Sequence, residues 1–363
     1  MTDHDLILMQ RALRLARKGL GRVSPNPLVG AVIVKNGRIL AEGYHKRFGG
    51  PHAEVNALSH LEEGLSKGST VYVTLEPCCH TGKTPPCTNA LLQARVQRVV
   101  VGMIDPNPVV SGRGIQILRD HGMDVTVGIL ETECRELNAP YIKAVTRRQP
   151  YITLKIAQTI DGNIATRKGL SRWITGDTSR RWVHKLRSEN DAVMVGVGTV
   201  LADNPHLTVR MVRGRSPRRI VLDSHLRIPD VAHLVSDKHT DQTIVVTGPS
   251  ADTRTIQTLQ NRGVQVWTVE TDSAGQIRLN SLWERLVDAG IYSILVEGGR
   301  EVFTSCLRSG ETDRLIVITA PKIVGDGISS IGNVGVETMD QAISLRQFKT
   351  FRKGTDWVMD GRL

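Results

Sequence analysis

The sequence predicts an α/β protein made of two consecutive domains. Its 363 residues exceed the length of one ordinary domain. Short runs of β-branched residues alternate with stretches of helical periodicity along the chain. The alternation stops at the polar stretch 146–150, "TRRQP", and then starts again. We therefore expect a first domain at residues 1–146 and a second at residues 150–363.

The first domain is expected to form a sheet covered by helices on both faces, because its short apolar runs alternate with helical patterns. The expected strands cover residues 28–35, 39–45, 69–76, 96–103 and 123–129. The expected helices cover residues 4–19, 52–63, 88–95, 113–121 and 131–145.

The second domain repeats this alternation and is expected to be doubly wound. The expected strands cover residues 151–157, 192–198, 219–223, 243–247, 264–269, 292–297 and 314–320. The expected helices cover residues 178–190, 251–262, 280–289 and 300–309. The tail, residues 335–363, carries no motif with recognisable chemistry and is expected to complete the second sheet.

Composition and charge limit the classes of partner. The N-terminal stretch reads as an amphipathic helix rather than a signal segment, and no apolar run approaches the ~20 residues that span a bilayer. We expect a cytoplasmic protein without a membrane partner. The net charge of +11 is spread over both halves, and aromatic residues make up 4%, which is thin for base stacking. Phosphorylated small molecules account equally well for a diffuse positive balance, so charge alone does not decide. Because the aromatic content is low and the charge is not concentrated, we expect no nucleic-acid partner.

Three of the five cysteines fall within ten residues, in "TLEPCCHTGKTPPC". In a reducing compartment such clustering indicates metal binding or catalysis rather than a disulfide framework. Cys78 and Cys87, with His52 from "PHAEV", supply two thiolates and one imidazole, the ligand set that zinc prefers. Glu54 lies two residues after His52, where it can act as a general acid and base. These residues follow the H-x-E…P-C-x-x-C pattern of zinc nucleobase deaminases.

One departure from that pattern leaves an alternative open. Eight residues separate Cys78 from Cys87 instead of two, and the insert contains Cys79 and His80. Either of these could close a four-ligand structural zinc site, whereas catalytic zinc keeps one position open. A redox pair of Cys78 and Cys79 is disfavoured because adjacent cysteines bridge only with strain. We favour catalytic zinc, with Cys78 as the ligand because it directly follows Pro77.

The second half has no G-x-G-x-x-G fingerprint, but three stretches could hold an anion. "ILVEGGREVFTSCL", residues 294–307, runs from a strand through two glycines into a helix, whose first N–H groups can approach a phosphate. Ser224 follows a strand directly, and the turn-rich stretch 198–210 contains Asp203 and Arg210. Ordinary packing turns produce the same strand–Gly–Gly–helix pattern, so this pattern alone does not identify a cofactor.

The motifs of the first half resemble a known family. "SPNPLVGAVIV", "GYH", "PHAEV", "YVTLEPCCHTGKTPPC" and "DPNP" are similar to the deaminase half of the bifunctional riboflavin biosynthesis deaminase–reductases. The resemblance implies a cytidine-deaminase-like α/β/α sandwich with one Zn²⁺ per chain, and it accounts for the long insert between the cysteines. It also implies that the substrate's pyrimidine and phosphate ends are held by Asn26, His45, His80 and Lys83. Cys79 stands where we expect serine in relatives.

The second half resembles the reductase half of the same family through "LKIAQTIDG", "SRWITG", "LRSENDAVMVGVGTVLADNPHLTVR", "VLDSHLR" and "LVEGGR". The resemblance implies a dihydrofolate-reductase-like fold that uses NADPH. The implied cofactor residues are Ala157, Trp173, Thr199, Asp203, Ser224, Gly299, Arg300, Glu301, Val302, Phe303, Thr304 and Ser305. The implied substrate residues are Ser171, Arg187, Leu207, Arg210, Glu297 and, as a further polar contact, Lys155.

Taken with the zinc pattern, the resemblance implies an enzyme that deaminates a phosphorylated pyrimidine and then reduces its ribose. It also suggests a homo-oligomer. Two other interpretations remain open from the residues alone. One is an RNA-editing deaminase joined to a basic binding domain, which would bind RNA in a salt-sensitive way. The other is a non-catalytic interaction protein that is stabilised by structural zinc.

Overall fold

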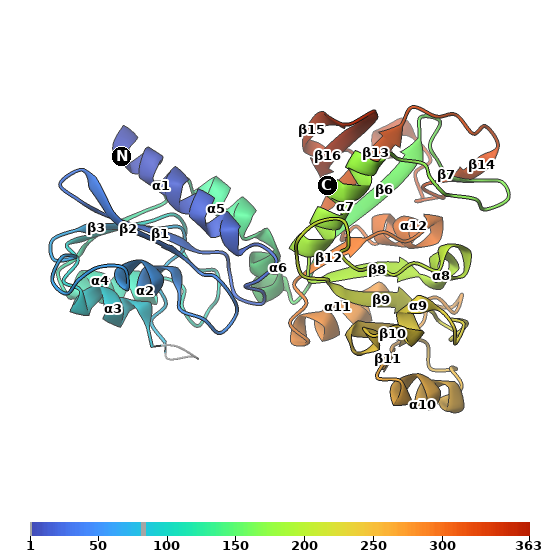
Figure 1. Ribbon diagram of the computed structural model, residues 1–363, viewed down its shortest axis with the longest axis horizontal. Helices are drawn as coiled ribbons and strands as arrows, with labels where there is room; N and C mark the ends of the chain where they lie inside the picture. Colours follow the sequence, from blue (N-terminus) through green and yellow to red (C-terminus); the bar gives the residue numbers. More distant parts are fainter. Residues whose placement is uncertain (1, 81–84) are drawn as a thin grey trace. The chain divides into compact units, whose positions relative to one another are not determined.

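The computed structural model describes residues 2–80 and 85–363. The chain divides into two compact units, Met1–Gln149 and Pro150–Leu363, each with its own sheet (Figure 1). The division lies inside the stretch 146–150 that marks the change of pattern in the sequence. No helix among the described residues is long and apolar enough to cross a membrane.

The first unit contains a five-stranded sheet in the order β2-β1-β3-β4-β5. Its strands are β1 (Gly30–Lys35), β2 (Arg38–Tyr44), β3 (Thr70–Val73), β4 (Arg98–Val101) and β5 (Asp124–Val127). Strand β1 is antiparallel to both of its neighbours, whereas β3, β4 and β5 are parallel. Val, Ile and Ala dominate the central strands, as is typical of strands that are buried on both faces.

Helices cover both faces of this sheet, because successive side chains of a strand point to opposite faces. Ala31 and Ile33 pack with α2 (Ala53–Leu58), α3 (Cys87–Gln93) and α4 (Arg113–Asp120). Val32 and Val34 pack on the other face with α1 (Asp3–Ala16) and with Cys134 of α5 (Glu131–Leu137). The α/β/α sandwich predicted for this half is confirmed.

Two predicted helices of the first unit were wrong in extent. The helix expected over 52–63 ends at Leu58. The helix expected over 131–145 is two helices, α5 and α6 (Ala139–Arg147), that are separated at Asn138. Pro140 in the first turn of α6 cannot continue an earlier helix, since it lacks an N–H and clashes with the preceding turn. The buried Asn138 amide holds this break in place by bonding Leu28 N at 2.7 Å and Leu28 O at 3.0 Å.

The second unit contains a nine-stranded sheet in the order β11-β10-β9-β8-β12-β6-β13-β16-β15. Its strands are β6 (Tyr151–Thr159), β8 (Ala192–Gly196), β9 (Arg218–Leu222), β10 (Thr243–Thr247), β11 (Gln265–Thr268), β12 (Ser293–Val296), β13 (Arg314–Ala320), β15 (Arg346–Lys353) and β16 (Asp356–Arg362). The strands from β11 to β13 are parallel, and β16 and β15 add an antiparallel edge. The tail therefore completes the second sheet, as predicted.

Alternation again divides the core between two faces. Ile294 and Val296 of β12 pack with α11 (Leu279–Asp288) and α12 (Arg300–Arg308). Leu295, between them, points to the opposite face and packs with Val183 and Leu186 of α7 (Asp177–Glu189). Farther along that second face, β8, β9 and β10 pack against Leu259 of α10 (Thr253–Asn261). The doubly wound arrangement predicted for this half is confirmed.

Several short elements of the second unit were not predicted. They are β7 (Asn163–Thr166), α8 (Val197–Asp203), α9 (His233–Ser236) and β14 (Gly327–Ser329). Strands β7 and β14 pair only with each other, although more than 160 positions separate them in the chain, so neither has a local signal. Helix α8 follows β8 without a connecting loop, and its valines and glycine read as a continuation of the strand.

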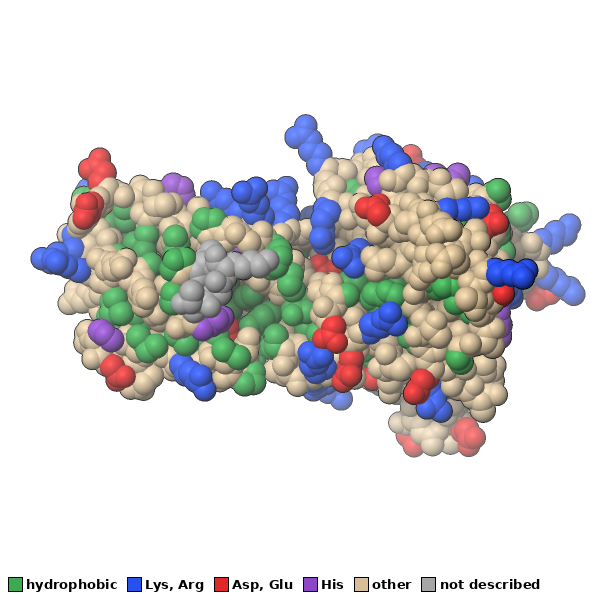
Figure 2. Space-filling model, turned by 90° about the horizontal axis from the view of Figure 1, so that it is seen from below, with side chains coloured by type: hydrophobic (Ala, Val, Ile, Leu, Met, Phe, Trp, Pro, Cys, Tyr) green, Lys and Arg blue, Asp and Glu red, His purple; other side chains and the backbone are tan. Residues whose placement is uncertain are grey.

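Basic side chains are distributed over both units. On the face in Figure 2, Lys and Arg lie on each unit, with Asp and Glu between them in several places. Some cations are paired below the surface, as in the bidentate contacts of the partly buried Arg314 with Asp360 and of the fully buried Arg219 with Asp237.

The packing of α2 on β2 depends on Gly43, and this contact predicts a large effect of one methyl group. A Cβ atom at Gly43 would lie 2.4 Å from both Ala53 O and Ala57 N. We expect Gly43→Ala to destabilise the protein by about 3 kcal/mol, the upper end for overpacking, in urea unfolding. Gly198→Ala is the control, because its Cβ meets nothing within 4 Å. An unchanged unfolding midpoint in Gly43→Ala would contradict this account.

Candidate functional site

The three predicted zinc ligands lie together in the first unit. His52 is the N-cap of α2, Cys87 is the first residue of α3, and Cys78 lies in the loop after β3. His52 Nδ1 lies 3.3 Å from Cys87 Sγ and 3.4 Å from Cys78 Sγ. The three donor atoms are within 4.8 Å of one another. The N-termini of two helices and the loop after a central strand thus bring the three ligands together.

This donor set fits zinc with three protein ligands. Two thiolates and one imidazole are soft to borderline donors, and Zn²⁺ binds such sets in tetrahedral geometry. Among the described residues, no further His, Cys, Asp or Glu joins the group. Cys79 and His80, which a closed structural site would need, are both described and lie outside it. The geometry therefore leaves a fourth position for water or substrate.

The thiols of Cys78 and Cys87 have pKa values that are shifted in opposite directions. The Cys87 thiol donates to the Cys78 sulfur, which lowers the pKa of Cys78, and the His52 imidazole lowers it further. The same hydrogen bond raises the pKa of Cys87. A thiolate rather than a thiol is the form that binds metal, so one ligand is ready in this form.

Glu54 is 3% exposed and lies beside these ligands in the first turn of α2. Burial raises the pKa of Glu54 to about 7, and the negative charge of Cys78 acts in the same direction. A carboxyl with a pKa near neutrality can take a proton and later give it back, which is the requirement for a general acid and base.

Two of the predicted pyrimidine and phosphate residues lie together next to the zinc ligands. Asn26 Nδ2 is 3.1 Å from His45 Nε2, and the His45 ring makes an edge contact with His52 at 5.4 Å between centroids. Burial lowers the pKa of His45. His80 is exposed in the loop after Cys79. Lys83 lies outside the described residues.

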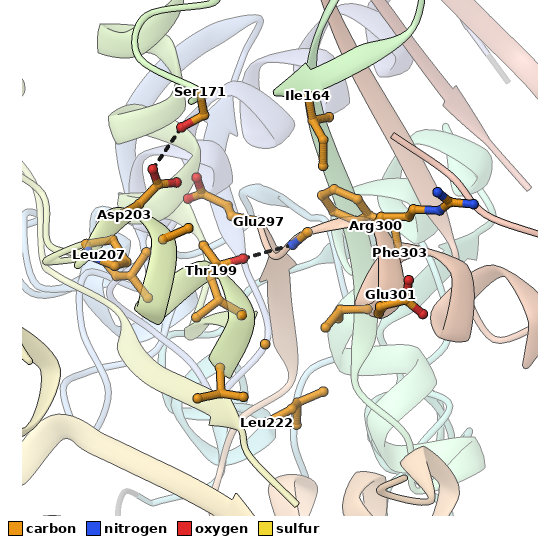
Figure 3. Close-up of a pocket in the computed structure, with 18 of the residues that line it drawn as sticks. Ile164, Ser171, Thr199, Asp203, Leu207, Leu222, Glu297, Arg300, Glu301 and Phe303 are labelled. Atoms are coloured by element: carbon orange, nitrogen blue, oxygen red, sulfur yellow. Dashed lines mark hydrogen bonds between the residues drawn. The ribbon is translucent and has the colours of Figure 1, made fainter. Parts of the chain in front are cut away.

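The predicted residues of the second half converge on one cavity of about 1230 Å³. All of them except Thr304 line it, and Figure 3 shows the labelled residues around it, with Thr199 and Asp203 from α8 and Arg300, Glu301 and Phe303 from α12. Thr304 instead faces away within α12, where its hydroxyl donates to Arg300 O and accepts from Gly332 N. The Thr304 side chain therefore does not share the cavity with its neighbours on α12, because a helix turns about 100° per residue.

The floor of the cavity is the place where the strand order reverses. From β8, the chain continues outward through β9, β10 and β11, and β12 then returns to lie on the other side of β8. Such a switch point at the carboxyl ends of parallel strands is the usual ligand position in open α/β sheets. A Cβ at Gly298 would lie 2.8 Å from Gly196 N, so glycine is needed for the two strand ends to approach.

The N-terminus of α12 opens toward this floor and suits an anion. Gly299 is the N-cap of this nine-residue helix, and no side chain caps it. Gly299 N donates to Thr199 Oγ1 at 3.0 Å, which fixes the turn (Figure 3). Unpaired N–H groups and the helix dipole favour a phosphate at such a position. The cavity and this terminus together fit a dinucleotide.

A buried ion-pair network forms one wall of the cavity. Glu297, 6% exposed in its side chain, accepts from Lys155 Nζ at 3.0 Å and from Arg187 at 2.5 and 3.0 Å. Burial alone would raise the pKa of Glu297, but the charges of Arg187 and Lys155 outweigh it and hold that pKa at about 2. The network therefore keeps the Glu297 carboxylate ionised and fixes it between Arg187 and Lys155 in the wall of the cavity.

Asp203 and Arg210 face other parts of the cavity. The Ser171 hydroxyl donates to Asp203 Oδ1 at 2.8 Å, which ties the loop before α7 to the end of α8 (Figure 3). Arg210 lines the cavity and makes only a long 3.5 Å contact with Thr208 Oγ1 through its guanidinium. Its charge is thus more available to a ligand than that of Arg187.

Sequence analysis missed His184, which also lines this cavity. It lies one helical turn before Arg187 on α7, and its Nδ1 accepts from Arg210 N at 3.1 Å. Burial and the charges of Arg187 and Arg210 lower the pKa of His184 to about 4, so the ring is neutral at pH 7. The i, i+3 spacing from Arg187 was a signal that could have identified it.

Comparison with known proteins identifies both halves. The family model described as "Cytidine and deoxycytidylate deaminase zinc-binding region" matches residues 2–103, and the model described as "RibD C-terminal domain" matches residues 150–359. Riboflavin biosynthesis protein RibD of Aquifex aeolicus is 45% identical over 98% of this chain and 97% of its own length. The RibD protein of Escherichia coli is 39% identical over 96% of both chains.

Solved structures agree over the full length. RibD of Acinetobacter baumannii has a TM-score of 0.88 at 36% identity and covers 99% of this chain and 98% of its own. A Thermotoga maritima protein described as a diaminohydroxyphosphoribosylaminopyrimidine deaminase and 5-amino-6-(5-phosphoribosylamino)uracil reductase has a TM-score of 0.85 at 39% identity, with the same coverage.

The Glu297 network predicts a pH dependence of stability. The folded-state pKa of Glu297 is about 2 against an ordinary value of 4.5, so its contribution is complete above about pH 4.5 and is lost as the pH falls toward 2. By linkage this loss is on the order of 3 kcal/mol. We expect Glu297→Gln, in urea unfolding at several pH values, to be destabilised at pH 7 by about 3–5 kcal/mol and to lose less stability on acidification.

Glu301→Gln is the matched control for this experiment, because Glu301 is exposed on α12. It should retain the stability of the parent at pH 7. If Glu297→Gln is also as stable as the parent at pH 7, Glu297 does not take part in a stabilising buried ion-pair network.

Proposed function

This chain belongs to the RibD family of riboflavin biosynthesis proteins and is a bifunctional enzyme with a deaminase and a reductase activity; we propose which residues carry each reaction. The deaminase is assigned to residues 1–146 and the reductase to residues 150–363. The observation that carries the proposal is the meeting of His52, Cys78 and Cys87 beside a buried Glu54 whose pKa is near 7. That arrangement suits hydrolytic removal of an amine.

The proposed substrate is 2,5-diamino-6-ribosylamino-4(3H)-pyrimidinone 5′-phosphate, in agreement with the description of the Thermotoga maritima relative. Zn²⁺, held by His52, Cys78 and Cys87, supplies the Lewis acid that activates water. Glu54 takes a proton from the attacking water and later delivers a proton to the amine, which leaves as ammonia. Asn26, His45, His80 and Lys83 are assigned to binding of the pyrimidine and of the phosphate.

The second reaction opens the ribose and reduces it to ribityl with NADPH, which supplies the hydride to C1′. The N–H groups at the start of α12 bind the cofactor diphosphate, with Arg300, Glu301, Val302, Phe303 and Ser305 beside it. Ala157, Trp173, Thr199, Asp203 and Ser224 line the rest of the cofactor path. Lys155, whose ammonium borders the cavity, donates the proton that the released ring oxygen needs.

The contacts of the two arginines divide their roles. Arg187 is paired with Glu297 and so fixes the carboxylate and Lys155 in place. Arg210 has no carboxylate partner among the described residues and is the better ligand for the substrate phosphate. Ser171, Leu207 and Glu297 complete the proposed substrate wall.

A homo-oligomer is also proposed. Apolar side chains remain exposed on the two outermost strands of the second sheet, namely Phe348 at 60%, Trp357 at 52% and Met359 at 41%. Exposed apolar groups on an edge of a sheet favour association of copies. Light scattering of the full chain would test this.

The deciding experiment follows ammonia release and NADPH oxidation by zinc-loaded protein on the proposed substrate. We expect ammonia release without NADPH, and NADPH oxidation only after deamination. Ammonia without NADPH oxidation would overturn the reductase assignment. If protein that carries one zinc per chain shows neither signal, the substrate assignment is overturned. Salt-sensitive RNA binding would then support the alternative of an RNA-editing deaminase.

Glu54→Gln is predicted to abolish ammonia release while leaving the reduction intact. Loss of a general acid and base costs about 10²–10⁴-fold in rate. Zinc content should stay at that of the parent, and reduction of separately supplied deaminated intermediate should not change. Glu62→Gln, an exposed residue after α2, is the control. Retained ammonia release in Glu54→Gln would contradict the assigned role.

Removal of zinc is predicted to separate the two activities. Since all three ligands belong to the first unit and the cavity lies within the second, chelation should abolish ammonia release but not NADPH oxidation on the deaminated intermediate. Zinc added back should restore ammonia release. Loss of both activities on chelation would contradict the assignment of one reaction to each unit.

A further inference from the structure

Glu76 is a buried carboxylate of the first unit that neither proposed reaction uses. It is 3% exposed and lies just after β3, in the segment of residues 76–78 (the ligand loop) that ends at the proposed zinc ligand Cys78. Burying a carboxylate is costly unless hydrogen-bond donors replace the water that it loses. The donors around Glu76 therefore show which parts of the chain it holds together.

Four backbone N–H groups donate to the Glu76 carboxylate. Its Oε2 accepts from Asp105 N at 3.1 Å and from Gly112 N at 2.9 Å. Its Oε1 accepts from Gly114 N at 2.9 Å and from Ile115 N at 3.3 Å. A carboxylate has about four lone-pair sites, so each donor can have its own acceptor site. One donor lies after β4 and three lie at the start of α4, so a single side chain joins both places to the ligand loop.

The N-cap residue of α4 has no side chain that could cap the helix. This residue is Gly112, whose φ of 78° lies in the left-handed region that favours glycine. The first N–H groups of a helix have no partner within it, and Glu76 supplies their acceptor from a distant part of the chain. A carboxylate is also favoured at the positive end of the helix dipole. Both effects stabilise the ligand loop in its place against α4.

Backbone contacts fix the ligand loop further. A Cβ atom at Gly114 would lie 2.1 Å from Pro77 O, so the Pro77 carbonyl occupies the space that a side chain would need there. Toward α3, Cys78 O accepts from Thr88 N at 3.2 Å, and Cys78 Sγ accepts from Cys87 N at 3.3 Å. The ligand loop is therefore held between the first turns of α3 and α4.

We propose that Glu76 is a positioning residue of the zinc site, which holds Cys78 in place beside the other two ligands. The inference rests on the zinc site of the deaminase function proposed above. Glu76 does not bind the metal itself, because its two oxygens accept from backbone N–H groups and it is not part of the ligand group. Its effect reaches the metal through the backbone of the ligand loop.

Cys78 is the ligand with the least support from regular structure. His52 is the N-cap of α2 and Cys87 is the first residue of α3, whereas Cys78 lies in no helix or strand. A ligand that is ordered before the metal arrives loses less conformational entropy on binding. Outer groups that orient metal ligands typically change the metal affinity about 10–100-fold. We therefore expect the contacts of Glu76 to affect the zinc affinity as well as the stability of the first unit.

Glu76→Gln tests this inference. An amide has one oxygen, and its NH₂ group would face backbone N–H donors, so the bonds on one side of the carboxylate are lost. We expect the zinc dissociation constant, measured by competition with a chelator, to rise about 10–100-fold. In Co²⁺-substituted protein, the absorption of the cobalt–thiolate bonds should weaken, because Cys78 is no longer held at the metal. Reduction of the deaminated intermediate, which uses the second unit, should not change.

Asp5→Asn is the matched control, because it makes the same chemical change at another buried carboxylate of the first unit. Asp5 is 2% exposed and accepts from the Tyr72 hydroxyl at 2.9 Å and from Arg98 Nη1 at 3.0 Å. These bonds join α1 to β3 and β4 and do not involve the ligand loop. Asp5→Asn should lower the melting temperature and leave the zinc dissociation constant unchanged.

The outcomes separate the inference from the proposed function. A parent protein that binds no zinc would overturn both. A parent that binds one zinc per chain, with an unchanged zinc constant and cobalt spectrum in Glu76→Gln, would overturn the inference alone. An equal rise of the zinc constant in Asp5→Asn would also overturn it, because affinity would then follow stability. If Glu76→Gln does not fold, Glu76→Asp decides: its carboxylate is too short to reach all four donors, so an unchanged zinc constant would contradict the positioning role.

Discussion

The chemistry of both units depends on one constraint, the common direction of parallel strands. Because β2 and β3 are both antiparallel to β1, they run the same way, so His52, which follows β2, meets Cys78 and Cys87, which follow β3, at one edge of the sheet. The same constraint brings the ends of β8 and β12 together in the second unit, where Gly196 and Gly298 permit the contact. Residues from distant parts of the chain therefore meet without any special connection.

Two buried glutamates show how environment assigns opposite behaviour to one side-chain type. Glu54 is buried beside a thiolate, and burial raises its pKa to about 7. Glu297 is equally buried, but Arg187 and Lys155 hold its pKa at about 2. The first is suited to move a proton, and the second stays charged and fixes the position of its cations. Burial alone does not distinguish the two roles, whereas the sign of the neighbouring charge does.

The histidines next to the two sites act through hydrogen-bond geometry. His45 bonds a carbonyl with one nitrogen and an amide with the other, and His184 accepts a backbone N–H from Arg210. His45 thus connects a backbone carbonyl to the Asn26 amide, whereas the His184 ring is itself held in place by a backbone N–H. This arrangement keeps binding groups oriented before the ligand arrives, which lowers the entropy that binding would otherwise cost.

The sequence by itself determined the alternation of strands and helices, the place of the domain boundary and the zinc pattern, because these signals lie within short stretches of chain. The spacing around His52, Glu54 and Cys78 needed no tertiary information. Only the tertiary structure decided which residues share a contact over a long separation. The Asn138 amide fixes the junction of α5 and α6 against Leu28, and Thr304 turns away from the cavity that its neighbours line. Such outcomes depend on the packing of elements that meet only after folding, and no local pattern encodes them.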